Sequence, residues 1–283
     1  MRTTGDTAVE TEHGARAAEA LRLAESDPRR SVELARATVR DARAAGDREA
    51  RSLAERAWGF AAFHLRDTDE ALTHLRTAIR VGEAAGSARL AAEGRMALAG
   101  VLTWRGRPGA ALREIGTALI ALDGVRHARA VAQQGAILQL LGRLPQALER
   151  YRVALPVLRR EDDRLWTHRV LLNRGVARAQ RHELAAAAED LRAAEALCAE
   201  LDLGLALAQV HQNLGFVCTR RGDVPAAMAY LDRAERRFRE LGSQLGPVLG
   251  DRAELLLSVR LIAEARQAAA GAVAALEREG RGV

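Results

Sequence analysis

The sequence predicts an all-α chain in which one helical hairpin is repeated about seven times. Ala, Arg and Leu fill 143 of the 283 positions, whereas Pro fills 6 and the aromatic residues 9. Strong helix formers with few helix breakers are typical of helices, and the strand-favouring residues are too sparse for a sheet. Small residues that recur near every fortieth position indicate a repeat array rather than two globular domains.

Each repeat unit is centred on one small residue, which we call its anchor. Six of the seven anchors are alanine, where the overall alanine content would give about one or two. Residues at offsets 0, +4 and +7 lie on one face of a helix, so small residues there let a neighbouring helix approach closely. The anchors are Ser31, Ala71, Ala111, Ala147, Ala187, Ala227 and Ala265, and the residues seven positions later are Thr38, Ala78, Ala118, Ala154, Ala194, Ala234 and Ala272.

A glycine recurs twelve positions before four of the anchors. Within a helix, glycine is about 1 kcal/mol less favourable than alanine. Its recurrence at Gly59, Gly135, Gly175 and Gly215 therefore predicts a close contact between the two helices of a unit.

The expected helix ends follow the same period. Acidic residues precede the second helix of four units as N-terminal caps, and prolines stand in several of those first turns. Fifteen residues after several anchors comes a glycine, or an aspartate, that would end the helix. The acids are Asp27, Asp67, Glu183 and Asp223, the prolines Pro28, Pro108, Pro145 and Pro225, and the helix-ending residues Gly46, Gly86, Asp162, Asp202, Gly242 and Gly280. We expect about fourteen helices in a single solenoid domain over residues 14–280, after a disordered N-terminal tail over residues 1–13.

These columns resemble the tetratricopeptide (TPR) repeat. The run Asn213-Leu214-Gly215, followed by Gly222-Asp223 and by Ala227, Leu231 and Ala234, matches that repeat. The resemblance covers about residues 14–280 and implies a right-handed superhelix whose concave groove binds a protein or peptide. The period is near 40 rather than 34, as in kinesin light chain. The composition and period also resemble the TPR regions of actinobacterial proteins that carry a C-terminal CHAT peptidase-like domain.

The composition excludes several reaction classes. The chain has no lysine, which rules out a Walker A lysine and Schiff-base chemistry. The seven histidines and two cysteines form no metal, redox or nucleophile motif. We therefore expect no catalysis, no metal and no cofactor.

Charge and hydropathy argue against nucleic-acid and membrane partners. The net charge is +6, but no block of five or six like charges occurs. No apolar run is long enough for a membrane span, and the N-terminal segment has no signal-peptide pattern. We expect a cytoplasmic protein.

One column of the first helices points to binding. Two residues before the small residue in the first helix of each unit, the first three units carry alanine and the next three carry Gln133, Asn173 and Asn213. The seventh unit departs from this pattern with Asp251. The TPR resemblance implies that this column lines the concave face, where an asparagine commonly binds peptide backbone. An amide suits that task because it offers both a donor and an acceptor.

Further polar residues are expected in the same groove. Arg129, Arg169 and Gln209 come one helical turn before the amide column, and arginines there suit a peptide that carries carboxylates. We also place Gln180, Gln212 and Arg220 in the groove. In the alternative interpretation, Asn173 and Asn213 bond to neighbouring helices and hold the stack together.

Three functional hypotheses follow. The first is a non-catalytic scaffold that binds a protein or peptide in its groove. The second is a regulatory or sensor module for an effector domain, such as a CHAT peptidase, on the same or another chain. The third is a helical array that binds RNA or DNA, which would be sensitive to salt.

Overall fold

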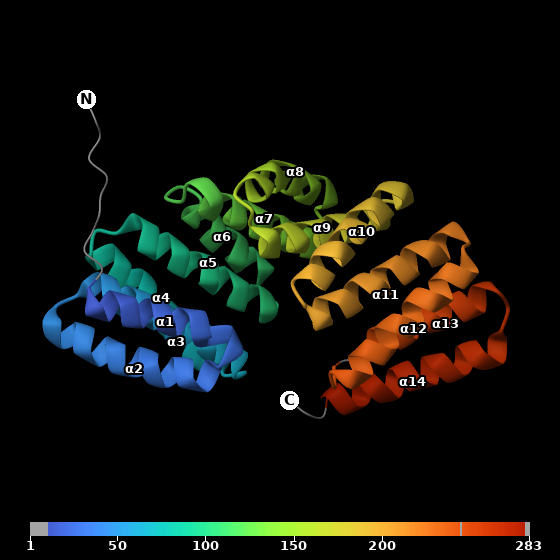
Figure 1. Ribbon diagram of the computed structural model, residues 1–283, viewed down its shortest axis with the longest axis horizontal. Coiled ribbons are helices and arrows are strands. Elements are labelled where there is room, and N and C mark those ends of the chain that lie inside the picture. The colour runs from blue at the N-terminus through green and yellow to red at the C-terminus, as the bar shows by residue number, and fades with distance from the viewer. Residues whose placement is uncertain (1–10, 244, 281–283) are drawn as a thin grey trace. The chain divides into compact units, whose positions relative to one another are not determined.

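The computed structural model describes residues 11–243 and 245–280, and these residues form fourteen helices and no strand (Figure 1). The predicted fold class, all-α with about seven helix-turn-helix repeats, is confirmed. The helices are α1 (Glu12–Ser26), α2 (Pro28–Ala45), α3 (Arg48–His64), α4 (Thr68–Ala84), α5 (Ala88–Trp104), α6 (Pro108–Ala118), α7 (Gly124–Leu140), α8 (Leu144–Arg160), α9 (Arg164–Gln180), α10 (Leu184–Glu200), α11 (Gly204–Arg221), α12 (Val224–Glu240), α13 (Gly246–Ser258) and α14 (Ile262–Gly280).

The chain divides into two compact units after Gly142, the first with α1–α7 and the second with α8–α14. Within each unit, every helix packs against the next one in the chain. The odd-numbered helices, which we call the A helices, also contact one another in turn: α1, α3, α5 and α7 in the first unit, and α9, α11 and α13 in the second. The even-numbered helices are called the B helices. A single domain over residues 14–280 stays a prediction.

The anchors lie in the core, as their small size predicts. The first six have no exposed surface, and Ala265 is 6% exposed. Ser31 is tolerated there because its hydroxyl donates a hydrogen bond to the Ala20 carbonyl oxygen (2.7 Å).

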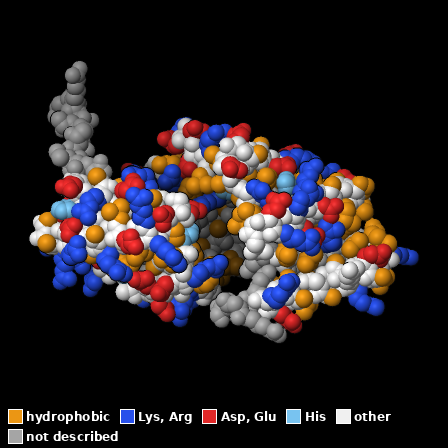
Figure 2. Space-filling view, turned by 60° about the horizontal axis from the view of Figure 1, so that its bottom comes forward, with side chains coloured by type: hydrophobic (Ala, Val, Ile, Leu, Met, Phe, Trp, Pro, Cys, Tyr) orange, Lys and Arg blue, Asp and Glu red, His pale blue; other side chains and the backbone are white. Residues whose placement is uncertain are grey.

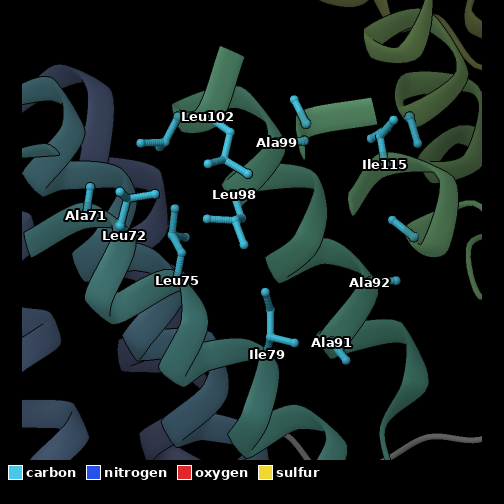
Figure 3. Packing of buried hydrophobic residues seen from close by; sticks show 14 of the residues in the cluster. Ala71, Leu72, Leu75, Ile79, Ala91, Ala92, Leu98, Ala99, Leu102 and Ile115 are labelled. Carbon is cyan, nitrogen blue, oxygen red and sulfur yellow. The ribbon is translucent and has the colours of Figure 1, made fainter. Parts of the chain in front are cut away.

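Larger side chains fill the space between the small ones. Figure 3 shows Leu72 and Leu75 of α4 facing Leu98 and Leu102 of α5. All four are buried, and burying such a side chain contributes about 1.5–3 kcal/mol. Alternating small and large residues therefore hold successive hairpins together.

Three of the four recurring glycines, Gly59, Gly175 and Gly215, make the predicted close contact, whereas that of Gly135 stays a prediction. At Gly59, an added Cβ would lie 2.7 Å from the Cγ of Leu75, the residue four positions after the anchor of its own unit. An added Cβ would likewise lie 2.8 Å from Leu191 at Gly175 and 2.8 Å from Leu231 at Gly215. Such separations leave no room for a side chain.

The helix ends largely follow the sequence signals. Asp27, Asp67 and Asp223 each accept a hydrogen bond from the backbone N–H three residues later, whereas Glu183 makes no such cap. The helix-ending residues Gly46, Gly86, Gly242, Asp162 and Asp202 have φ values between 48° and 73°, the left-handed conformation expected after a helix.

Two boundaries differ from the regular pattern. The spacing of 36 between Ala111 and Ala147 arises because α6 has only 11 residues, whereas the other B helices have 17 to 19. Helix α1 begins at Glu12, inside the predicted 1–13 tail, because the Thr11 hydroxyl caps it by accepting from the Gly14 N–H (3.0 Å). Residues 1–10 of that tail lie outside the described residues. None of the described helices is long and apolar enough to cross a membrane.

Candidate functional site

The polar residues singled out in the sequence all stand on A helices. Two of them, Arg129 and Gln133, lie on α7 in the first unit. The others lie in the second unit, on the contacting helices α9 and α11: Arg169, Asn173 and Gln180, and Gln209, Gln212, Asn213 and Arg220. The second unit therefore brings most of the candidate residues together.

Two of the amides bond to the neighbouring A helix. Gln133 Nε2 donates to the carbonyl oxygen of Met96 on α5 (3.0 Å). Gln212 Nε2 donates to Oδ2 of Asp251 on α13 (2.7 Å). Burial raises the pKa of Asp251, and the Gln212 hydrogen bond acts in the opposite direction. These two glutamines thus join successive repeats, the role that the alternative interpretation gave to Asn173 and Asn213.

The two asparagines do not join helices. Asn173 is partly exposed, and its side chain makes no hydrogen bond within the part of the chain that the structure describes. Asn213 is also partly exposed, and its Nδ2 donates to the Gln209 carbonyl oxygen one turn earlier on its own helix (2.7 Å). Both amide oxygens keep their acceptor capacity, and the Asn173 amide keeps its donors.

The remaining candidates differ in how they are held. The Arg169 guanidinium lies 5.2 Å from the centre of the Trp166 ring, a cation–π contact that orients it. Arg220 contacts the Phe216 ring in the same way at 5.2 Å and reaches Glu254 of α13 at 3.6 Å. Gln180 and Gln209 are exposed, and Arg129 is half-buried.

An ionic cluster in the first unit was missed by sequence reasoning. The largely buried Glu93 carboxylate on α5 pairs with Arg56 of α3, with Arg89 one turn earlier (3.2 Å) and with Arg126 of α7 (3.0 Å). Three arginines on one carboxylate leave a net charge of +2 on this A-helix face. Burial lowers the pKa of Arg56, and the charge of Glu93 opposes that shift.

A sequence signal for this cluster exists. That signal is the spacing of Arg89 and Glu93, which are four residues apart on one helix, whereas Arg56 and Arg126 lie on other helices and show no such pattern. On the face that Figure 2 shows, arginines and acidic side chains are likewise intermixed rather than segregated. No group of three or more potential metal ligands occurs among the described residues.

Comparisons with known proteins place the fold. No protein-family model matches the sequence, and no curated protein matches it. Solved structures do match: the APC/C hetero-tetramer Cut9–Hcn1 has a TM-score of 0.74 at 14% identity, over 92% of this chain and 46% of that chain. A Rap protein complexed with Competence and Sporulation Factor has a TM-score of 0.71 at 14% identity, over 99% and 78%.

A third similar structure is the STAND protein PH0952 from Pyrococcus horikoshii, a signal-transduction ATPase with a tetratricopeptide repeat sensor. Its TM-score is 0.72 at 12% identity, over 96% of this chain and 43% of that chain. This chain has the fold of the TPR-repeat proteins. At these identities the likeness concerns the fold alone.

Proposed function

We propose that this chain is a non-catalytic scaffold of the cytoplasm that binds a segment of a protein or peptide along its A helices. The observation that carries the proposal is the exposure of Asn173 and Asn213 and their lack of hydrogen bonds to other helices. They occupy equivalent positions on two contacting helices, both are partly exposed, and neither bonds to a neighbouring helix. The third amide of this column, Gln133, is bonded to the neighbouring helix instead, through the Met96 carbonyl oxygen.

The chemistry of an amide column suits an extended main chain. Each backbone residue presents one N–H donor and one C=O acceptor, and an amide side chain can pair with both. The two asparagines recur at 40 residues, so one ligand backbone would meet the same group in successive repeats. Gln180 and Gln209, both exposed on these helices, extend the polar surface.

Arginine next to the amides favours an acidic segment. Arg169 stands one turn before Asn173 on α9 and is oriented by Trp166, which reduces the entropy that a ligand must overcome. Its planar guanidinium can hold a carboxylate through two hydrogen bonds. In the first unit, Arg129 and Gln133 stand in the same two columns, but the Gln133 amide is bonded to the Met96 carbonyl oxygen, so the proposal rests on the second unit.

Affinity capture tests the proposal. Wild-type protein and the double variant Asn173→Ala/Asn213→Ala serve as baits, and the recovered proteins are quantified by mass spectrometry. We expect partners that wild type enriches and the double variant loses several-fold. Gln146→Ala, which removes an exposed amide from B helix α8, is the matched control and should keep those partners. Equal recovery by all three baits would contradict the proposal.

A second candidate function is a regulatory or sensor module for an effector domain, such as a CHAT peptidase, in the same or another chain. The similarity to PH0952, whose repeats form a sensor in a larger protein, favours it. An effector domain encoded in the same reading frame or in a neighbouring gene would support this role. An effector whose activity is unchanged by adding or removing this chain would refute it.

A further inference from the structure

A shallow cavity of about 330 Å³, open to solvent, lies in the second unit between the first half of α8 and the second half of α9. Its volume is at the lower end of the range for small-molecule sites, about 300–1,000 Å³. Eight residues line it: Pro145, Leu148, Glu149 and Arg152 of α8, Arg174 and Arg178 of α9, and Arg181 and Glu183 of the turn that leads to α10. The cavity shares no residue with the amide column.

Two of its arginines are held by one buried carboxylate. Arg174 binds Asp190 of α10 through Nε (2.8 Å) and Nη2 (2.6 Å), and Arg178 Nη1 binds the same group at 2.8 Å. The Asp190 side chain is only 6% exposed, so these contacts fix both guanidinium groups firmly. Nη1 of Arg174, and Nε and Nη2 of Arg178, make no hydrogen bond within the described residues. Fixed donors are therefore left over at the cavity wall.

The two carboxylates that line the cavity are already paired. Glu149 accepts two hydrogen bonds from Arg152, both 2.7 Å long, and Glu183 accepts one from Arg181 (2.8 Å). Four arginines against Glu149, Glu183 and Asp190 leave a net charge of +1. The first turn of α8, which has no acidic residue and no side-chain cap, adds the positive end of a helix dipole.

We infer that this cavity binds a small phosphate monoester. A phosphate group carries a charge close to −2 at pH 7 and offers three acceptor oxygens. It therefore suits several fixed guanidinium donors better than a ligand with a single carboxylate would. Pro145 and Leu148 provide the apolar part of the wall against which the organic group packs. This site goes beyond the proposed scaffold function, because it needs none of the groove residues.

Calorimetric titration of the full chain with phenyl phosphate tests the inference. We expect saturable binding, with weaker binding of inorganic phosphate, which lacks the apolar group, and of phenylacetate, which lacks the dianion. Arg152→Gln removes one lining guanidinium and should weaken phenyl phosphate about five- to tenfold, because it removes a charge-assisted hydrogen bond that solvent partly screens.

The matched control lies on the same helix. Arg160 has the same 71% side-chain exposure as Arg152 and also pairs with a glutamate, Glu161, but it does not line the cavity. Arg160→Gln should leave the affinity within about twofold. Equal effects of the two substitutions would overturn the inference, as would affinities for inorganic phosphate or phenylacetate equal to that for phenyl phosphate.

A gain of affinity offers a test that misfolding cannot imitate. Glu149→Gln removes a negative charge from the wall and should tighten phenyl phosphate about two- to threefold. Asn173→Ala/Asn213→Ala should bind phenyl phosphate like wild type, so this site and the scaffold function can fail separately. Absence of saturable binding, or no tightening with Glu149→Gln, would overturn the inference.

Discussion

Single glycines decide how closely the two helices of a repeat approach. Gly59, Gly175 and Gly215 each stand against a leucine of the paired B helix, at separations that exclude a Cβ. The gain in packing has to offset the poor helix propensity of glycine, about 1 kcal/mol relative to alanine. Sequence periodicity predicts this contact because both partners recur at fixed offsets.

We expect Gly215→Ala to lower the free energy of unfolding by about 1–2 kcal/mol. The new Cβ would lie 2.8 Å from Leu231, and overpacking of about 1–3 kcal/mol outweighs the better helix propensity. Gly250→Ala is the control, because no atom lies within 4 Å of its added Cβ, and it should stabilise by about 0.5–1 kcal/mol. Urea unfolding of both variants measures this; a stabilising Gly215→Ala would refute the contact.

The buried cysteines should be unreactive. Burial, with a smaller contribution from Glu195, raises the pKa of the Cys198 thiol from 9.0 to about 11, and burial also raises that of Cys218. Because the thiolate is the nucleophile, we expect iodoacetamide at pH 8 to label the folded chain far more slowly than the chain in urea. Comparable rates would contradict this prediction.

The same shift makes stability depend on pH. The pKa of Cys198 is higher in the folded chain than in the unfolded one. The contribution of its neutral thiol to the free energy of unfolding is therefore fully present below about pH 9 and is lost as the pH rises toward 11. Cys198→Ala should remove that part of the decline.

The side-chain amides mark where residue-level prediction stops. Gln133, Asn173 and Asn213 stand in one column, yet Gln133 bonds to the next helix and Asn173 does not. Whether such an amide bonds to the next helix depends on its side-chain rotamer and on the position of a carbonyl group, which for Gln133 is 37 residues away in the sequence. The residue types in a column do not specify either of these.

At the level of the helix, most boundaries could be predicted and a few could not. Acidic caps and left-handed residues mark the ends because their chemistry is local. The short α6 could be seen only as a spacing of 36, and the start of α1 at Glu12 depends on Thr11, a cap within a segment predicted as a tail. The Glu93 cluster was missed because its partners belong to three different helices.

Bonds between successive A helices should contribute to stability. Gln212→Ala removes the hydrogen bond to Asp251 on α13 and leaves a partly buried carboxylate with one donor fewer. We expect a loss of about 1–2 kcal/mol in the free energy of unfolding, measured by urea denaturation. Gln180→Ala, at an exposed site on α9, should change it by less than about 0.5 kcal/mol. Equal losses would show that the α11–α13 bond is not stabilising.

For the whole molecule, the repeat accounts for the composition. Two columns of small residues in seven units require much of the alanine, and the sparse aromatic residues fit a core built mainly from Ala and Leu. Some of the arginines pair with acids on another helix, as Arg56 does with Glu93 and Arg174 with Asp190. Arg169 instead stacks on Trp166 beside the amides, and we propose it for the ligand.

The most direct test of the account is the affinity of a captured partner segment for the double variant Asn173→Ala/Asn213→Ala. Fluorescence anisotropy with the labelled segment gives Kd, and thermal unfolding of the same samples gives Tm. We predict a Kd weakened several-fold relative to wild type and to Gln146→Ala, with Tm unchanged. An unchanged Kd, or a loss of affinity matched by a fall in Tm, would contradict the central claim that these amides bind a partner rather than hold the repeats together.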